Sequence, residues 1–583
     1  MYRIKVRLHN QQGSVLVLVL ILMTVLAIFA TAAYEVATNN QHMLAVASAS
    51  DSAFFNAEQG LNKYLWQINS DPRFYTDTTA FSLVAAGESN YNVYQRKSDE
   101  EGSYRVQIWV PLQEGVEVNN RALIRATGWD ADNPGRVRSI EAEIVKRTFT
   151  QYGMITNGER NEDGDINYWV NNEKFYGPLH TNDTLYIGSY NPIFYGPVSY
   201  TKGINPSSRR EDSSVFRQGT SQADALVFPP SNDKLMAQAR IGGAGHYYSG
   251  RACIMLKGSS YDIRYYDNVN KTWMYNGHPY TYTPNSSYFS YDDRRKEIGT
   301  YILYPDEPSK KRTFSSFAAL RAAVSSLALP DNGVIYVNGR TGDNGNGGLT
   351  YEFKFDPEYG NVFVSGELDG ELTIAAANDI YITAYDPVDW RYPSSTYRVT
   401  ANYTDGLTYT NTGFTQNMDG TDWLGTTVTG AGDDMLGLVA SRRVQILHYN
   451  WPSQENSTSN YSSLYYSWGG SGSGNAGDGN PIDVAARYQD ITIHAAIYAK
   501  DLIFGFEHPK VGSDKGEIKL VGSIAQAFRG TVGTTGGTGY TKHYSHDPRM
   551  LYQSPPHYIE PANTGWQTMK WREITTHITS NPE

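Results

Sequence analysis

Two short runs of the sequence place histidine near carboxylate or amide side chains. They comprise His180, Asn182 and Asp183, and His543, His546 and Asp547. Such groups could serve general acid–base catalysis, or bind a metal ion if a loop gathered the side chains. Turn networks have the same composition, and no further ligand lies at a recognised metal spacing. We therefore expect no catalytic residue, no metal site and no cofactor in either run.

Three turns rich in Asp, Asn and Gly offer the oxygen ligands that Ca²⁺ prefers. They lie at residues 161–165, 343–347 and 419–422. None of them completes an EF-hand loop, so we expect ordinary turns. The Gly-rich run 533–539 lacks the Lys-Ser/Thr of a phosphate-binding loop, and the Gly/Ser run 469–474 has no strand-turn-helix context for a nucleophile elbow. The sequence thus predicts a protein that is not an enzyme.

The composition is that of a β-rich protein working outside the cytoplasm. The chain has 583 residues, 45 of them Tyr and 54 Gly, and a net charge of −11, which disfavours a broad nucleic-acid surface. Cys253 is the single cysteine, so no disulfide forms within the chain. A length of this kind allows two or three domains, each with its own hydrophobic core.

An uncharged apolar stretch from Ser14 to Ala33 precedes these regions. Its length roughly matches the bilayer's hydrocarbon core of about 30 Å. The basic residues before it, Arg3, Lys5 and Arg7, predict that the chain after Ala33 lies outside the cytoplasm. The small residues at 30–32 leave a cleaved signal peptide as an alternative.

The helix is expected to continue beyond the apolar stretch, because no Pro and no turn cluster occur before about Asn69. Apolar residues recur there at helical spacing, namely Met43, Ala47, Phe54, Ala57, Leu61, Leu65 and Ile68. We therefore predict one transmembrane and amphipathic helix over 14–69, after a leader of residues 1–13. A single-pass anchor with a coiled stalk is the simpler alternative.

The run from Gln12 to Leu18 resembles the N-terminus of type IV prepilins. The resemblance implies that a prepilin peptidase cuts between Gly13 and Ser14 and that Ser14 is then methylated. Most pilins have Glu where this chain has Leu18, a departure shared with PilX-type minor pilins and tip pseudopilins. The run from Ala53 to Leu61, which includes Glu58, is similar to the end of the PilX-type N-terminal region.

That resemblance implies a non-enzymatic minor pilin or tip subunit of a type IV pilus or type II secretion-like filament. The helix would sit in membrane lipid and then pack against other pilin subunits, with Leu18, Ala27 and Ala30 at the contact. Its other partners would be the prepilin peptidase and the inner-membrane assembly platform. The alternatives are a membrane-anchored adhesin that binds surface glycans and a polysaccharide-active β-helix enzyme.

Three strand-like runs between about residues 90 and 150 predict a small antiparallel sheet packed on the outer half of the helix. They lie at 104–110, 122–128 and 139–145. A helix followed by such a sheet is the minimal plan of a pilin. We place this pilin-like sheet at 70–150.

The rest of the chain, 151–583, repeats a short motif of two apolar residues separated by one position. Examples are 362–364, 372–374, 436–438 and 491–493. A Phe-Tyr-Gly-Pro run at 175–178 recurs 19 residues later at 194–197. These features predict a right-handed parallel β-helix-like solenoid, with long loops at 384–433 and 448–489; a β-sandwich is the alternative.

Overall fold

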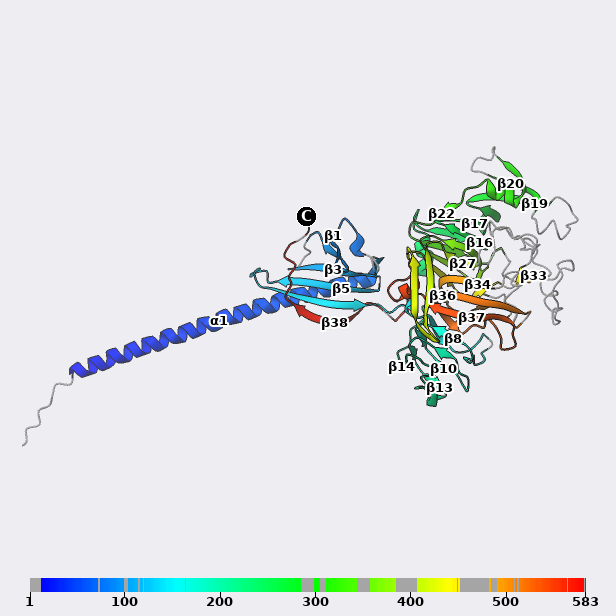
Figure 1. The fold of residues 1–583 in the computed structure, drawn as a ribbon. Coiled ribbons are helices and arrows are strands. Elements are labelled where there is room, and N and C mark those ends of the chain that lie inside the picture. Colours follow the sequence, from blue (N-terminus) through cyan, green and yellow to red (C-terminus); the bar gives the residue numbers. More distant parts are fainter. Residues whose placement is uncertain are drawn as a thin grey trace, which may run out of the picture. The chain divides into compact units, whose positions relative to one another are not determined.

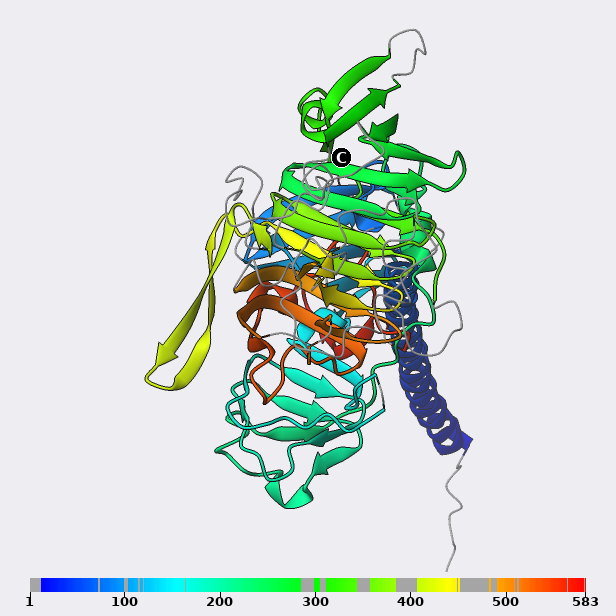
Figure 2. The ribbon, with the colours of Figure 1, turned by 90° about the vertical axis from the view of Figure 1, so that its right-hand side faces the viewer.

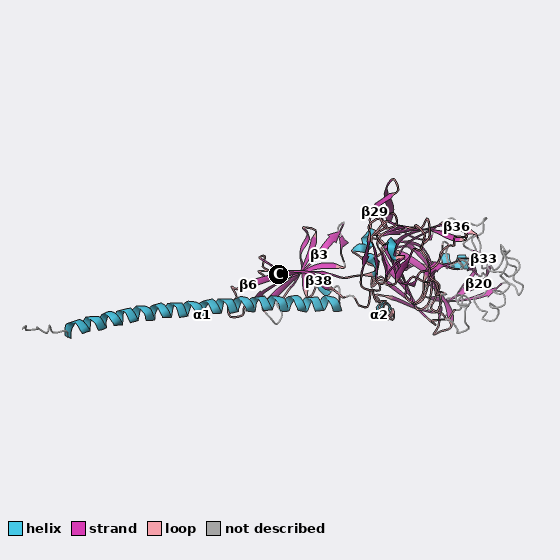
Figure 3. Cartoon of the chain, turned by 90° about the horizontal axis from the view of Figure 1, so that it is seen from below, coloured by secondary structure: helices cyan, strands magenta, loops and turns pink. Residues whose placement is uncertain are grey.

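A computed structural model of the chain is mainly β with one long N-terminal helix, as the sequence predicts (Figure 1, Figure 3). It describes residues 12–582 apart from 72–73, 99–102, 114–115, 119, 163, 285–297, 305–310, 343–356, 384–405, 448, 451–481, 484–489, 508, 511–512, 564 and 581. The chain forms two compact units. We call Met1–Lys146 with Gly565–Glu583 the helix–sheet unit, and Arg147–Thr564 the large unit.

Helix α1 spans Gln12–Ser70 without a break. Only its second half packs against the sheet, through a stripe of mostly small side chains. The buried positions are Ala49, Ala53, Ala57, Gly60, Leu61, Tyr64 and Ile68. Of the predicted apolar positions, Phe54 and those from Ala57 onward pack on the sheet, whereas Met43 and Ala47 are exposed. The buried residues in this part of the helix are the small Ala49 and Ala53, because the helix backbone lies too close to the strands for a larger side chain.

Gly128 sets the distance between this helix and the sheet. A Cβ atom at Gly128 would lie 2.3 Å from the Ala53 carbonyl oxygen and 2.3 Å from the Ala57 amide nitrogen. Both are backbone atoms of α1, so a side chain here would push the helix away from the strand. The Asn56 side chain also donates a hydrogen bond of 2.8 Å to the Trp129 carbonyl.

The sheet of the helix–sheet unit is antiparallel, in the order β1-β2-β3-β5-β6-β38 with β4 beside β3. The strands are β1 Phe81–Glu88, β2 Tyr91–Arg96, β3 Tyr104–Gln113, β4 Val116–Glu117, β5 Arg121–Trp129, β6 Val137–Val145 and β38 Gln567–Ile574. A short 3-10 helix, η1 (Phe74–Thr76), follows α1. The three predicted strands are β3, β5 and β6.

Strand β38 corrects the predicted extent of the solenoid, which ran to residue 583. Residues 565–583 belong to the helix–sheet unit. β38 pairs with β6, with Gln567 opposite Val145 and Ile574 opposite Ser139. A strand this far along the chain carries no local signal that assigns it to a sheet more than 400 residues earlier.

The strands of the large unit pair mostly in parallel and lie one above another (Figure 2). One column of ten runs, in spatial order, β14 Thr220–Gln222, β12 Val198–Tyr200, β9 Leu179–Thr181, β7 Met154–Gly158, β36 Asp514–Phe528, β34 Ile491–Ala499, β30 Met435–Ala440, β25 Glu371–Ala376, β23 Val334–Asn338 and β15 His246–Ser249. Parallel pairing between successive coils is what a solenoid requires. Its right-handed sense stays a prediction, as does the sandwich alternative.

A second parallel column shares β36 and β34 with the first. Its other strands are β11 Ile193–Phe194, β8 Lys174–Tyr176, β37 Gly539–His546, β27 Gly406–Tyr409, β24 Val362–Leu368 and β16 Ala252–Gly258. A further parallel series starts at β24, which pairs with β26 Ile380–Ile382; β26 pairs with β31 Val444–Ile446, and β31 with β35 Phe504–Phe506. Leu, Ile, Val and Phe side chains from these strands fill the interior.

The chain order of these columns is not monotonic. The chain enters in the middle at β7, proceeds through β9 and β12 to β14, and then crosses to the other end of the column at β15. From there it winds back until Ile524 of β36 pairs with Met154 of β7. The crossing segment holds helix α2 (Asp233–Ala239), whose Leu235 and Ala239 are buried beside Val334 and Ala375.

The predicted 19-residue echo is a pair of stacked coils. Phe194 pairs with Phe175 in parallel, and the Tyr195 ring stacks on the Tyr176 ring with centroids 4.8 Å apart. The Gly-Pro steps approach so closely that a Cβ atom on Gly196 would lie 2.1 Å from the Gly177 carbonyl oxygen. Glycine is therefore required where the two coils turn together.

Antiparallel elements extend from this stack. A meander comprises β17 Ser260–Asp267, β18 Thr272–Tyr275, β19 His278–Pro284, β20 Ile298–Leu303, β21 Arg312–Ser316 and β22 Leu327–Ala328, with α4 Phe317–Ala322. β28 Thr412–Asp419 and β29 Asp422–Gly430 form a hairpin. Shorter pairs are β10 Thr184–Tyr186 with β13 Gly203–Asn205, and β32 Tyr449–Asn450 with β33 Ile482–Asp483.

The predicted loop 384–433 is therefore wrong over its second half, since β27 joins the stack and β28–β29 form a hairpin. Gly and Thr in these strands hid the apolar pattern. Most of the predicted loop 448–489 lies outside the described residues. In the described part of the large unit, 3-10 helices lie at η2 Phe149–Gln151, η3 Ser207–Arg209 and η6 Pro548–Leu551.

Candidate assembly helix

The first half of α1 presents large apolar side chains to solvent all around its circumference. The exposed fractions run from 42% at Val25 to 71% at Tyr34. In the described part of the chain, α1 is the one helix long and apolar enough to cross a membrane, by length and composition only. A core helix of a soluble protein with this composition would be buried, whereas none of the apolar window in α1 is.

The predicted processing and assembly residues lie along this helix. Gly13 and Ser14 fall in its first turn, which begins at Gln12, and residues 1–11 lie outside the described residues. Leu18 is 66% exposed, and Ala27 and Ala30 are exposed as well. Glu58 is half-buried in the part of the helix that packs on the sheet. These positions stay predictions, because the structure of one chain tests no processing or assembly step.

Three exposed aromatic or aliphatic side chains continue the apolar surface beyond the membrane-length stretch. Leu44, Phe55 and Trp66 are 70%, 64% and 68% exposed. They are spaced by 11 residues, about three helical turns, so they lie on one face of α1. The rotation of about 100° per residue places that face opposite the Ala53 and Ala57 side of the helix. This stripe was not predicted, although its 11-residue spacing is visible in the sequence.

The face of the sheet turned away from α1, here called the outer face, carries rows of opposite charges. Glu141 of β6 lies between Arg125 of β5 and Arg572 of β38, and accepts hydrogen bonds from both. Burial opposes the ionisation of Glu141, but the two arginines more than offset it, so the pKa of Glu141 lies below its usual value. In the next row Glu143 bonds to Arg121 and lies 3.9 Å from the Lys570 ammonium group. These rows fix the register of β38.

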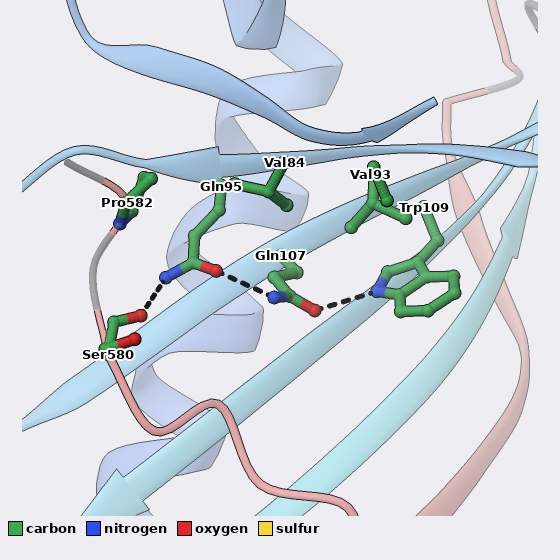
Figure 4. A pocket seen from close by; sticks show the side chains of 8 residues that line it. Val84, Val93, Gln95, Gln107, Trp109, Ser580 and Pro582 are labelled. Atoms are coloured by element: carbon green, nitrogen blue, oxygen red, sulfur yellow. Dashed lines mark hydrogen bonds between the residues drawn. The ribbon is translucent and has the colours of Figure 1, made fainter. Parts of the chain in front are cut away.

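A cavity of about 330 Å³ opens on the same face (Figure 4). Its eight lining residues carry no charge; they are Val84, Ala85, Val93, Gln95, Gln107, Trp109, Ser580 and Pro582. A chain of hydrogen bonds crosses its floor. The Trp109 indole N–H donates to Gln107 (3.1 Å), Gln107 donates to Gln95 (2.7 Å), and Gln95 donates to the Ser580 carbonyl (2.5 Å).

The His180 group forms a closed hydrogen-bond network. His180 is fully buried, with Nε2 3.0 Å from Asn182 Oδ1 and Nδ1 2.8 Å from Ser199 Oγ. Burial lowers the pKa of His180 to about 4, so the ring is neutral near pH 7. Asp183 bonds to Lys202 (2.9 Å) instead of to the histidine. The structure thus brings His180 and Asn182 together but not Asp183.

The second group is dispersed over three separate contacts. His546 is buried with Nε2 2.8 Å from the Thr150 carbonyl, and burial lowers its pKa. His543 stacks on Tyr176 at 5.4 Å and contacts Gln416. Asp547 accepts hydrogen bonds from Arg549, one of 2.6 Å. Among the described residues no group of three or more His, Cys, Asp or Glu could bind a metal ion.

The Asp-rich turns serve local contacts where they are described. In the turn 161–165, Glu162 accepts a hydrogen bond of 2.6 Å from Arg443, and Asn161 accepts one from the Asp165 amide. The turn 419–422 is the tip of the β28–β29 hairpin. The turn 343–347 lies outside the described residues.

Comparison with known proteins gives little to extend these observations. No protein-family model matches the chain, and a search of the curated proteins finds no match. Among solved structures, the crystal structure of the competence-associated pilin ComZ from Thermus thermophilus is similar, at 11% identity over 91% of this chain and 98% of that one. The TM-score is 0.26, too low to support a statement about this chain.

Proposed function

We propose that the chain is a non-enzymatic, pilin-like subunit of a cell-surface filament, of the minor or tip kind. Its helix α1 anchors it in the membrane with the large unit outside the cytoplasm, and then packs against other subunits. The observation that carries this proposal is the exposed apolar surface of α1, which continues past a membrane's thickness as the stripe Leu44, Phe55 and Trp66. A lipid bilayer covers about 20 helical residues, so this stripe needs a protein partner.

The N-terminal sequence supports the processing that such a subunit requires. Helix α1 begins at Gln12, two residues before Ser14, so cleavage after Gly13 would leave Ser14 as the first residue of the helix. Leu18 would carry no charge to pair with a neighbouring subunit, which suits a rare or terminal position in the filament. The histidine groups singled out by the sequence are engaged in hydrogen bonds within the fold, which supports assembly over catalysis.

The N-terminal mass of the protein from cells with a prepilin peptidase tests the processing. We expect a chain that begins at N-methylated Ser14, and an unprocessed chain both for Gly13→Leu and in cells without the peptidase. A chain that begins near Tyr34 would instead indicate a cleaved signal peptide. Normal maturation of Gly13→Leu would contradict the proposal.

The stripe itself can be tested by its effect on incorporation into filaments. Replacing Phe55 by Asp should lower recovery in the sheared filament fraction about tenfold, because a buried Phe contributes roughly 1.5–3 kcal/mol. The matched control is Gln59→Asp, which adds the same charge at another exposed position of α1. Equal recovery of the two variants would show that the stripe is not an assembly surface.

Glycan binding by the large unit is the second candidate function. A cluster of tyrosines favours it: the Tyr168 ring lies 6.0 Å from Tyr186 and 6.1 Å from Tyr190, and Tyr168 and Tyr190 are 39% and 38% exposed. Exposed aromatic faces can stack on sugar rings. Tyr168→Ala with Tyr190→Ala should abolish binding on a glycan array, and an unchanged binding profile would remove this candidate.

A further inference from the structure

The last residues of the chain lie across the outer face of the sheet in the helix–sheet unit. We call Thr575–Ser580 with Pro582 the tail, all of which the structure describes. Within these residues only Ile578 is buried, at 9% exposed. The tail follows directly after β38 and proceeds from β6 toward β2, so it crosses the strands instead of extending the sheet.

Three buried polar side chains on three different strands bind the tail. The Ser139 hydroxyl of β6 lies 2.8 Å from His577 Nδ1, the Thr127 hydroxyl of β5 accepts from the Ile578 amide at 2.9 Å, and Gln95 of β2 donates to the Ser580 carbonyl. The three sheet residues are 1%, 2% and 4% exposed. Two of these bonds use the peptide backbone of the tail, which is how a groove recognises an extended segment.

The cavity of Figure 4 extends this groove beyond Ser580. Gln95 and Gln107 each use one amide hydrogen and one oxygen lone pair in the hydrogen-bond chain, which leaves one of each for a ligand. Val84 and Val93 supply an apolar wall. An uncharged floor that both donates and accepts is complementary to a peptide amide, and not to an ion.

The tail holds this site weakly. One buried aliphatic side chain and three hydrogen bonds act against the conformational entropy of ordering about six residues, and the two contributions are of similar size. The tail should therefore leave the groove readily. A segment of the same sequence from another molecule has the same complementarity.

We propose that the outer face of the sheet is a peptide-binding groove that the chain's own tail occupies, and that in the assembled state it takes the tail of a second copy. The residues that bind are Gln95, Thr127 and Ser139, and the anchor is Ile578. The tail then acts as an exchangeable latch between subunits. The groove belongs to the sheet and not to α1, so peptide binding by one chain is independent of the proposed function, whereas exchange between copies rests on it.

Peptide binding tests the groove. A chain that ends at Ile574 is titrated, in detergent, against a fluorescein-labelled peptide of residues 575–583, with anisotropy as the readout. We expect saturable binding that is about fivefold weaker for Thr127→Val, since one hydrogen bond is lost, and absent for a peptide with Ile578→Asp. The full chain should bind about twofold more weakly, because its own tail occupies the groove for about half of the time.

A full chain with Ile578→Asp guards against misfolding of the shortened one. It keeps every residue of the tail except the anchor and should bind the unmodified peptide as the shortened chain does. Failure of both chains to bind the peptide, with native circular dichroism, would overturn the groove.

Disulfide trapping tests the second copy. In a Cys253→Ala background, a chain with Ser139→Cys is mixed with one carrying His577→Cys and allowed to assemble. Cross-linked dimers are expected, because these side chains are in contact. A single chain with both cysteines serves as the control for geometry. If that control closes internally and the mixture gives no dimer, the latch acts within one chain only and the proposal of a second copy is wrong.

Discussion

Acid should destabilise the large unit through its buried histidines, and His180 is the position at which to test this. Burial lowers the pKa of His180 to about 4, and that of His494 to about 4. Both rings are neutral in the folded chain above that pH. In the unfolded chain a histidine titrates near its ordinary value of about 6.5.

The sign and size of the effect follow from this difference. As the pH falls from about 6.5 to about 4, the unfolded chain takes up a proton that folded His180 refuses, so the free energy of unfolding decreases. A difference of about 2.5 pKa units corresponds to about 3 kcal/mol for His180. This stability is fully present above pH 6.5 and is lost as the pH falls through that window.

His180→Gln removes the titration and keeps an amide that can donate to Asn182. Urea unfolding of the detergent-solubilised chain, with hydrogen exchange read on the β9 peptide, gives the free energy of unfolding at about pH 7 and about pH 4. We expect the difference between the two pH values to be about 3 kcal/mol smaller for His180→Gln than for the parent. His42→Gln, an exposed histidine on α1, should leave it unchanged. An identical pH dependence of His180→Gln and the parent would refute the reasoning.

Three further substitutions test the packing. Gly128→Val places a side chain 2.3 Å from the α1 backbone and should lower the stability of the helix–sheet unit by about 3 kcal/mol, measured by thermal unfolding against Gly135→Val, where no atom lies within 4 Å of a Cβ. Glu141→Gln weakens the hydrogen bonds to Arg125 and Arg572 and should cost about 2 kcal/mol and speed hydrogen exchange in β38; unchanged exchange would show that these bonds do not hold the strand. Gly196→Ala should disrupt the coil contact with Gly177 and release proteolytic fragments cut near residue 196, whereas Gly203→Ala, with open space around it, should resist like the parent.

The sequence predicted the parts of the fold that depend on local pattern. The uninterrupted apolar and amphipathic stretch predicted α1, and the alternation at 104–110, 122–128 and 139–145 predicted three strands of its sheet. The 19-residue echo predicted neighbouring coils because stacking repeats the same environment, and Phe175 and Phe194 occupy it in turn.

Long-range order could not be predicted from the sequence, for physical reasons. Pairing of β38 with β6 depends on charge rows such as Glu141 with Arg572, whose partners are 431 residues apart. The entry of the chain into the middle of the stack at β7 leaves no local mark, since each coil looks alike. The outer-face groove consists of Gln, Thr and Ser at strand positions that read as solvent-exposed, but in the structure they are buried and bonded to the tail.

The paired ends of β6 and β38 have a consequence for how such a protein could change over time. Strand β6 ends at Val145 and β38 begins at Gln567, and these two residues lie opposite each other in neighbouring strands. The large unit is thus an insertion into what would otherwise be a β-hairpin. A short turn in its place would leave all pairing between β6 and β38 intact, and another domain whose ends lie equally close would fit the same position. The large unit can therefore be replaced while the helix–sheet unit stays as it is.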